Sequence, residues 1–242
     1  MEKNRDNCLI LFINPIEEDK INVDLKTAFG SEQGKKINRD LLVNAYRKVK
    51  NFQNAISIIS YEKTSNHPDL TWIDHDDPGF VEFREKNLED RIRDTFKLSF
   101  FTGAKKAILI DPMTPEIKEE WLAQAFEAIN DKTVALGVND DASFYLLGFT
   151  QSNIKILDTP GFTFGKSAEN LTERIKRGKL SVFFTPEAYG VKNEEYLRRW
   201  SSKAGKELPK TEKPSETPVT DSKIQDKDIS ARKQHKRVTR LN

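Results

Sequence analysis

Short apolar runs and amphipathic stretches alternate along the first 200 residues of the chain. Continuous apolar runs are typical of strands buried on both faces, and the candidate strands are 8–13, 55–61, 107–110, 134–136, 144–149, 154–157 and 180–184. Apolar positions recur at helical spacing between them, which predicts helices at 34–52, 87–101, 116–129, 167–177 and 193–200, with a short helical turn at 25–30. Such alternation favours an α/β fold with a mostly parallel sheet.

The polar stretch at 62–82 interrupts this alternation. It contains two His and four Asp within the 14 residues HPDLTWIDHDDPGF. Their spacing matches no zinc template, and Pro68, Pro78 and Gly79 are typical of a loop. We therefore predict a loop without a metal site over this stretch.

The composition changes after Trp200, and the change predicts two parts. From 201 to 242 there is no aromatic residue, and 11 Lys/Arg stand against 6 Asp/Glu, whereas 1–200 holds 29 against 32. Such a tail cannot bury enough apolar surface to offset its ordering entropy. We predict an α/β domain over 1–200 and a disordered basic tail over 201–242.

The basic end of this tail, ARKQHKRVTR at 231–240, is the only place where we expect contact with nucleic acid or an acidic partner. It lacks aromatic residues for base stacking, so such binding would be weak and independent of sequence. A solubilising tail is the alternative that we favour.

Cysteine content and hydropathy indicate where the protein resides. The single cysteine, Cys8, excludes an internal disulfide and fits a reducing compartment. No apolar stretch reaches the length of a membrane span, and the N-terminal residues MEKNRDN are too polar for a signal peptide. We therefore expect a cytoplasmic protein without a membrane partner.

The acidic turn at 139–143 is the strongest candidate for a functional site. Asp140 and Asp141 follow the apolar run 134–136, at the kind of strand end where an open α/β sheet presents its ligand site. Two such carboxylates can hold a hard divalent cation and, through it, a diphosphate. An ordinary turn built by Asn and Asp is the alternative. The loops 14–24 and 111–115 follow other strands, so all three loops should converge.

These three loops, in this order, resemble a bacterial family of glycosyltransferase-like proteins with the A-type nucleotide-diphospho-sugar transferase fold. Some of its members are described as selenodomain-associated transferases. The resemblance runs from about Leu9 to Leu197. Its most specific part is the stretch from Gly137 to Gly148, with the acidic pair, an aromatic pair and Leu-Leu-Gly; it is supported by Asn14-Pro15, by Leu88 with Arg91, and by KKAILI at 105–110.

The resemblance implies a three-layer sandwich around a mostly parallel sheet, a nucleotide-sugar substrate and a divalent cation, Mg²⁺ or Mn²⁺, if the protein is active. It implies a metal held by Asp111 and Asp141, and a substrate bound by Lys20, Arg91, Asp140 and Asp141. Lys20 would neutralise phosphate charge, and Arg91 would bind phosphate or brace the loop. An ion pair on the helix surface with Glu89, Asp90 or Asp94 is the alternative role for Arg91.

The sequence departs from the family pattern at several implied site positions. Asn22 and Asp24 replace a lysine and an arginine of the first loop, Met113 replaces the metal-binding aspartate, Ala142 and Ser143 replace two glycines, Phe162 replaces a tryptophan, and Gly190-Val191-Lys192 replaces Asp-Val-Asp. A carboxylate in place of a phosphate-binding arginine reverses the sign of the interaction, and a thioether is a poor ligand for Mg²⁺. We therefore predict a transferase-fold protein with weak or no glycosyl transfer. The alternative is a non-catalytic interaction protein.

Overall fold

A computed structural model gives the structure of the protein over residues 3–13, 23–62, 70, 73–74, 79–83, 88–158 and 168–204. Strands and helices alternate through most of this part of the chain. The strands are β1 (Asn7–Ile13), β2 (Ile56–Glu62), β3 (Phe80–Phe83), β4 (Lys106–Ile110), β5 (Thr133–Val138), β6 (Phe144–Thr150) and β7 (Ser181–Phe184). The helices are α1 (Val23–Asn51), α2 (Leu88–Phe101), α3 (Glu119–Ala128), the 3₁₀ helix η2 (Ile154–Asp158), α4 (Ala168–Arg177) and α5 (Glu194–Ala204).

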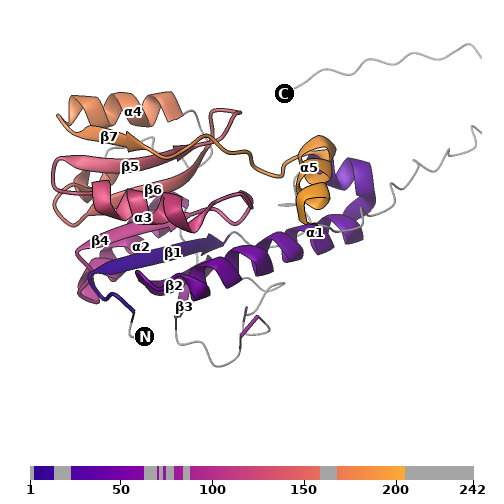
Figure 1. Ribbon diagram of the computed structural model, residues 1–242, viewed down its shortest axis with the longest axis horizontal. Helices are drawn as coiled ribbons and strands as arrows, with labels where there is room; N and C mark the ends of the chain where they lie inside the picture. The colour runs from indigo at the N-terminus through magenta and orange to yellow at the C-terminus, as the bar shows by residue number, and fades with distance from the viewer. Residues whose placement is uncertain are drawn as a thin grey trace, which may run out of the picture. The chain divides into compact units, whose positions relative to one another are not determined.

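The seven described strands form one sheet in the order β3-β2-β1-β4-β6-β5-β7 (Figure 1). All neighbours pair in parallel except those of β6, which runs antiparallel to both β4 and β5. A tight turn can join β5 to β6 because the two strands are antiparallel. The acidic turn is this connection, and it lies at the end of the sheet where the parallel strands finish.

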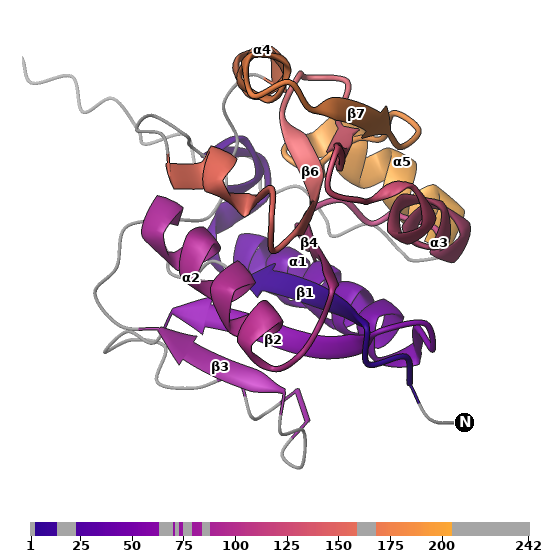
Figure 2. The same ribbon diagram turned by 90° about the vertical axis from the view of Figure 1, so that its left-hand side faces the viewer.

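Helices cover both faces of the sheet (Figure 2). On one face, α1 and α3 pack over the sheet through Leu42, Val49, Leu122 and Phe126, among others. On the other face, α2, η2 and α4 cover the sheet through residues that include Ile92, Phe96, Leu157, Leu171 and Ile175. This three-layer α/β arrangement around a mostly parallel sheet confirms the fold class predicted from the sequence.

A third apolar cluster joins the first and last described helices. Leu25, Phe29 and Leu41 of α1 pack with Leu197 and Trp200 of α5. Figure 1 shows α5 beside the N-terminal part of α1. This part of α1 bends at Gly30, whose φ of 76° and ψ of 167° are not helical, so the predicted end of the helical turn at 25–30 is confirmed. The cluster holds α5 close to the carboxyl end of the sheet.

Three predictions about single elements were wrong. The run 154–157 forms a 3₁₀ helix and not a strand, because Ile154 and Leu157, three residues apart, lie on the same side of such a turn and are both buried. Helix α3 begins at Glu119 and not at 116. The polar stretch at 62–82 contains the edge strand β3, which pairs with β2.

Two further findings concern Cys8 and the hydropathy of the helices. Cys8 is fully buried in the sheet, and this burial raises the pKa of its thiol to about 12, so it is a core residue and not a nucleophile. No helix in the described part of the chain is long and apolar enough to cross a membrane. Residues 205–242, which include the basic segment at 231–240, lie outside the described residues.

Candidate functional site

Three chain segments meet where the strands β4, β5 and β7 end. The backbone N–H of Asp140 donates to the carbonyl of Ala188 at 2.9 Å, and the N–H of Val191 donates to the carbonyl of Met113 at 2.8 Å. The loop after β4, the acidic turn and the segment after β7 are therefore joined by main-chain hydrogen bonds. The expected convergence of the loops 111–115 and 139–143 is confirmed, and the segment 188–192 joins them. The first loop, 14–22, lies outside the described residues.

The acidic turn is closed by its own side chains. The N–H of Asn139 donates to the carbonyl of Ser143 at 2.7 Å. One oxygen of Asp141, Oδ1, accepts from the Ser143 backbone N–H at 3.0 Å and from the Ser143 hydroxyl at 2.5 Å. Ala142, between them, has a φ of 62°, a left-handed conformation that glycine adopts more easily. Asp141 thus serves the turn with one oxygen and leaves the other for a different partner.

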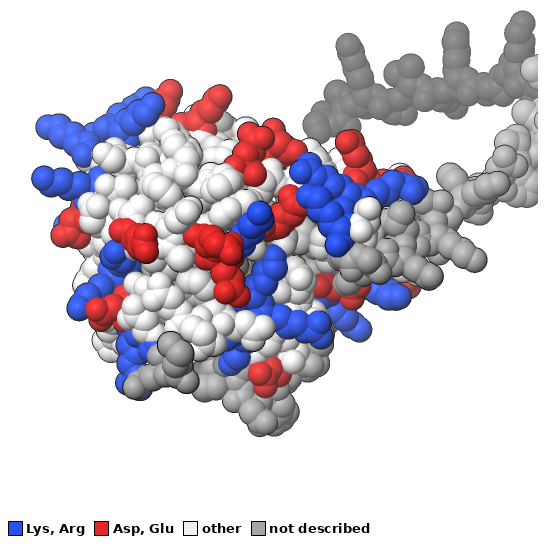
Figure 3. Space-filling model, in the orientation of Figure 1, with Lys and Arg blue, Asp and Glu red and all other residues white. Residues whose placement is uncertain are grey.

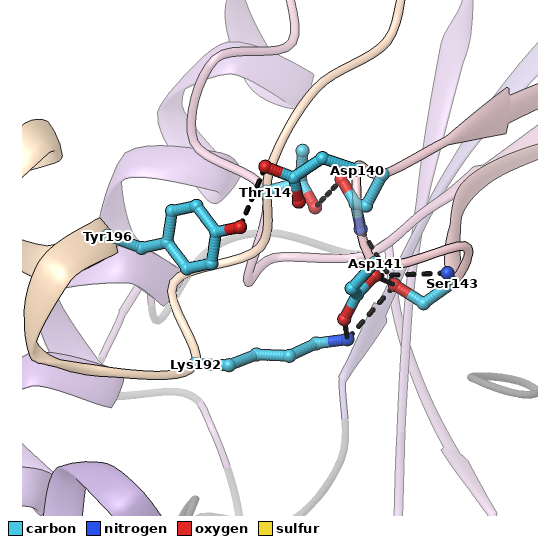
Figure 4. A network of polar contacts seen from close by, with 7 residues as sticks. Thr114, Asp140, Asp141, Ser143, Lys192 and Tyr196 are labelled. Atoms are coloured by element: carbon cyan, nitrogen blue, oxygen red, sulfur yellow. Dashed lines mark hydrogen bonds and ion pairs between the residues drawn. The ribbon is translucent and has the colours of Figure 1, made fainter.

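That partner is Lys192, which reaches the turn from the segment after β7 (Figure 4). Its Nζ lies 2.5 Å from Oδ2 of Asp141 and 2.9 Å from the hydroxyl oxygen of Ser143. Burial alone would raise the pKa of Asp141, but the hydrogen bonds from Lys192 and Ser143 outweigh it and hold the pKa below its ordinary value. The Asp141 carboxylate is therefore ionised and paired with an ammonium group.

Asp111 is the third charged group of this site. It is half-buried at the end of β4, and its Oδ1 accepts the N–H of Met113 at 3.0 Å. Burial raises the pKa of Asp111 to about 6; the hydrogen bond from Met113 and the charge of Lys192 lower it, while the charge of Asp141 raises it further. Asp111 thus lies within electrostatic range of both Lys192 and Asp141.

The Met113 side chain lies elsewhere. It packs against the cluster formed by α1 and α5, which accounts for a methionine at this position. The backbone path of the loop brings Asp111 toward the acidic turn instead.

The second carboxylate of the acidic turn also has a partner from the C-terminal segment. The Tyr196 hydroxyl of α5 donates to Oδ2 of Asp140 at 2.7 Å, and this bond to a carboxylate raises the pKa of Tyr196 to about 12 (Figure 4). The Tyr196 ring stacks on Tyr189 with 5.2 Å between centroids. The guanidinium of Arg199 also contacts the Tyr189 ring, 4.1 Å from its centroid. Asp140 and Asp141 therefore each have a partner from the segment that leads into α5, although both carboxylates remain exposed.

This arrangement does not fit a divalent cation of the type that the family resemblance implies. Mg²⁺ and Mn²⁺ require several oxygen ligands, and an ammonium group next to them would repel the ion. Lys192 stands beside Asp141 and Asp111, and no group of three or more His, Cys, Asp or Glu in the described residues is placed to hold a metal. In this conformation, the Lys192 ammonium supplies the positive charge that a metal ion would otherwise supply to Asp141.

A hollow of about 680 Å³ lies beside the acidic turn, between the turn, α4 and the end of β7. Four carboxylates and one ammonium group line it: Asp140, Glu169, Glu173, Glu187 and Lys176. The excess of negative charge is unfavourable for a diphosphate, which carries negative charge itself. The space next to the acidic turn therefore disfavours an anionic ligand.

The remaining predicted site residues lie apart from this centre. Arg91 is not on the surface of α2: its side chain is 1% exposed, its guanidinium lies 4.1 Å from the centroid of the Phe12 ring, and Glu62 is 3.8 Å away. Burial lowers the pKa of Arg91 to about 10, and the charge of Glu62 opposes this effect. Its substrate-binding role stays a prediction. Lys20 and Phe162 lie outside the described residues.

The sequence did not identify Lys192 and Tyr196 as partners of the acidic turn. The only signal was the substitution at 190–192, where a lysine stands in place of an aspartate of the family pattern. An acid-to-base change beside a predicted cation site indicates a side chain that can replace the cation. The contact itself spans 51 residues along the chain, so no local pattern could show it.

The two glycines that flank the most specific motif leave room for close packing. A Cβ at Gly137 would lie 2.6 Å from the Tyr145 ring, and one at Gly148 would lie 2.5 Å from the Ile129 side chain. The Tyr145 hydroxyl interacts with the hydroxyl of Thr185 and donates to the carbonyl of Pro186, at 2.7 Å in both cases. These glycines therefore maintain the sheet and the path after β7, which supports the site indirectly.

Comparison with solved structures confirms the nucleotide-diphospho-sugar transferase fold that the resemblance implied. A proposed nucleotide-diphospho-sugar transferase from Desulfovibrio desulfuricans G20 has a TM-score of 0.69 and 20% identity, over 83% of this chain and 88% of that protein. The 4-diphosphocytidyl-2C-methyl-D-erythritol synthase from Anaerococcus prevotii has a TM-score of 0.56 and 12% identity, over 84% and 97%. A CMP:2-keto-3-deoxy-manno-octonic acid synthetase in complex with CTP has a TM-score of 0.52 and 11% identity, over 84% and 100%.

Within this fold, residues 45–161 match the family described as "Uncharacterized protein conserved in bacteria (DUF2064)". The fold that the resemblance implied is thereby confirmed, and the chain is a divergent member of that fold. No curated protein matches the chain in sequence. At these identities the solved structures establish the fold, and the chemistry has to be argued from the site.

Proposed function

We propose that the chain is a glycosyltransferase-like protein with weak or no transfer activity, in which the protein's own lysine takes the position of a catalytic cation. The observation that carries this proposal is the position of the Lys192 ammonium, 2.5 Å from Asp141 and 2.9 Å from the Ser143 hydroxyl. An ammonium group offsets the negative charge of these carboxylates but has no open coordination positions. It cannot bind several oxygens of a diphosphate at once, as a divalent cation does.

The surroundings of the acidic turn support the same proposal. The adjoining hollow has four carboxylates and one ammonium group, so a nucleotide diphosphate would meet negative charge there without a metal to balance it. The substitutions at Asn22 and Asp24 remove two positive charges that the family resemblance implies for the first loop. Positive charge is therefore reduced at the phosphate side, and the negative charge at the metal side is already neutralised by the protein's own lysine.

The competing proposal is an active, cation-dependent enzyme, and one observation favours it. Asp111 and Asp141 lie close enough for their charges to interact, as a shared cation requires. In that case Asp111 and Asp141 hold Mg²⁺ or Mn²⁺, and Lys20, Arg91, Asp140 and Asp141 contact a nucleotide-sugar. Lys192 would first have to leave Asp141, and Tyr196 would have to leave Asp140, so this reading needs a rearrangement of the segment 189–199.

Calorimetric titration of the full chain distinguishes the two proposals. Uridine and guanosine diphospho-sugars are titrated with and without Mn²⁺, and the Asp141→Asn variant serves as the matched control because it removes a charge but retains the shape. We expect no saturable heat at millimolar ligand in either protein. Mn²⁺-dependent binding by the chain that disappears in Asp141→Asn would establish the enzyme and overturn the proposal.

A non-catalytic interaction protein is the second role that we propose, with the fold as scaffold and the basic segment 231–240 as one contact for an acidic partner. The paired carboxylates of the acidic turn agree with a scaffold role, because a site closed by its own side chains no longer depends on a ligand. Removal of residues 205–242, followed by a binding measurement with generic RNA at low salt, tests the contribution of the tail. Unchanged binding would exclude the tail as the contact.

A further inference from the structure

A second candidate site lies at the opposite end of the sheet from the acidic turn. Two hollows, of about 600 Å³ and about 1000 Å³, adjoin there, because Asp131, Ser152 and Lys155 line both. Together they form one groove, here called the basic groove, that passes between the C-terminal end of α4, η2 and the C-terminal end of α2. This end of the molecule faces the viewer in Figure 2.

The charges that line the basic groove are mainly positive. Five cations and two carboxylates line it: Lys105, Lys106, Lys155, Arg174, Arg177, Glu127 and Asp131. Asp131 already accepts hydrogen bonds from the hydroxyls of Thr150 and Ser152, so one of its oxygens has donors within the protein. Figure 3 shows Lys and Arg side chains gathered at the left-hand edge, over the C-terminal end of α4. The groove therefore attracts an anion, whereas the hollow at the acidic turn repels one.

Two of these cations, Arg177 and Lys105, form exposed ion pairs that a phosphate can replace. Arg177 pairs with Glu173 at 3.2 Å, and the two side chains are 79% and 64% exposed. Lys105 pairs with Asp6 at 2.8 Å on an equally exposed part of the surface. Exposed pairs of this kind contribute little to stability. A phosphate that replaces these ion pairs would therefore cost the protein little stability.

A highly exposed aromatic residue is the chain neighbour of a residue that lines this groove. Phe101, the last residue of α2, is 89% exposed. Its neighbour Phe100 lines the groove, and so does Gly103, whose φ of 100° turns the chain away from the helix. A phenyl ring in water has no packing role in the monomer, but its face can stack on a nucleobase. Cationic grooves with aromatic stacking positions are the usual means by which proteins hold single-stranded nucleic acid.

We propose that the basic groove binds single-stranded nucleic acid, with phosphates at Lys155 and Arg177 and a base stacked on Phe101. The two hollows together exceed the volume of an ordinary small-molecule pocket, about 300–1,000 Å³, and form a continuous path, which suits a polymer. This site uses none of the residues of the acidic turn, so it is independent of the proposed function.

Fluorescence anisotropy of a labelled oligouridylate tests this proposal with the full chain. The double variant Lys155→Gln with Arg177→Gln removes two groove cations. The matched control, Lys36→Gln with Arg47→Gln, removes two exposed cations from α1 and leaves the tail and the net charge identical between the two proteins. We expect the groove variant to bind about tenfold more weakly at low salt and the control to lose less than about twofold. The slope of log K against log salt should fall by about 1.4 in the groove variant.

The aromatic contact is tested in the same assay. Phe101→Ala should weaken binding by about tenfold, the lower part of the range for loss of a stacked base. Phe184→Ala is the matched control, since Phe184 is 52% exposed but lies at the acidic hollow. Phe184→Ala should leave the affinity unchanged.

Three results would overturn the proposal. The first is an equal loss in the groove variant and the α1 control, which would indicate a general charge effect. The second is undiminished binding in both, which would assign the RNA contact to the tail. The third is binding to vesicles of equal parts phosphatidylcholine and phosphatidylserine without binding to the oligonucleotide, which would identify a membrane contact. Thermal unfolding of each variant confirms that the comparisons concern folded protein.

Discussion

Lys192 and Asp141 form an ion pair with 2.5 Å between Nζ and Oδ2, although they are 51 residues apart in the chain. The two side chains are only 36% and 39% exposed, and the hydroxyl of Ser143 lies within 2.9 Å of the same Nζ. A surface ion pair alone stabilises a protein little. The importance of this pair lies in its position, because it neutralises a carboxylate for which the family resemblance implies a role as a metal ligand.

We expect the substitution Lys192→Asp to create a divalent-cation site. The change removes the ammonium group and adds a third carboxylate next to Asp111 and Asp141, the type of ligand set that Mn²⁺ accepts. Isothermal titration with MnCl₂ should show saturable binding to the variant and none to the parent chain. Lys192→Met is the control, as it removes the charge without adding an oxygen ligand. A variant that binds no more Mn²⁺ than the parent would contradict the assigned position of Lys192.

Asp111→Asn should stabilise the protein at neutral pH. The folded pKa of Asp111 is about 6, raised by burial above its ordinary value of 3.8. Between these values the unfolded chain releases its proton while the folded protein retains it, so the free energy of unfolding falls as pH rises through this range. The cost at pH 7 is about 2 to 3 kcal/mol. Asparagine keeps the oxygen that accepts the Met113 N–H.

Urea unfolding of parent and Asp111→Asn at several pH values measures this effect. The variant should be the more stable protein above pH 6, and the difference should shrink toward zero as the pH approaches 3.8. Asp158→Asn, at an exposed carboxylate, serves as the control and should show no such trend. If Asp111→Asn is less stable than the parent at pH 7, Asp111 is held by attractive interactions that exceed its burial.

Tyr196→Phe should loosen α5 from the acidic turn. The substitution removes the hydroxyl that donates to Asp140 at 2.7 Å and leaves the ring that stacks on Tyr189. A hydrogen bond to a partly exposed carboxylate contributes about 1 kcal/mol, which corresponds to a drop of about 2–4 °C in Tm for a domain of this size. Hydrogen exchange should become faster in α5, with α2 as the internal reference. Equal exchange in α5 would show that the Tyr196 bond does not hold the helix.

Ala142→Gly should raise the Tm. Ala142 has a φ of 62°, where an L-residue with a Cβ is strained by about 1–2 kcal/mol, and glycine relieves more strain than it costs in chain entropy. We expect a net gain of about 0.5–1 kcal/mol, or a rise of about 2 °C. Ala128→Gly, in the last turn of α3, is the matched control and should lower the Tm. A drop for Ala142→Gly would mean that the turn relaxes without strain at this residue.

Much of the fold was predictable because each buried strand carries its own apolar run. The stretch 8–13 is buried on both faces and forms β1, and the run 144–149 forms β6. The run 154–157 failed because four residues with apolar positions three apart fit a 3₁₀ turn as well as a strand. Strand β3 was missed because an edge strand with half-buried residues has no continuous apolar run, and the nearby Pro78 and Gly79 indicate a loop.

The candidate site was predictable only in part. The convergence of Asp111 with the acidic turn follows from a general rule, since loops at the carboxyl ends of parallel strands meet. The role of Lys192 does not follow from any such rule, because it depends on where the segment after β7 packs. That position is set by the contacts of Leu197 and Trp200 with α1, which are long-range in sequence and leave no local pattern.

The cluster that joins α1 to α5 also fixes the order in which the site can be completed during synthesis. Asp140 and Asp141 leave the ribosome about fifty residues before Lys192 and Tyr196, and chains fold from their N-terminal parts first. Until α5 has docked on α1, both carboxylates face solvent without these partners and remain open to ions from the surroundings. The nascent chain is thus more acidic at this turn than the finished protein, in which Lys192 and Tyr196 are the partners of the two carboxylates.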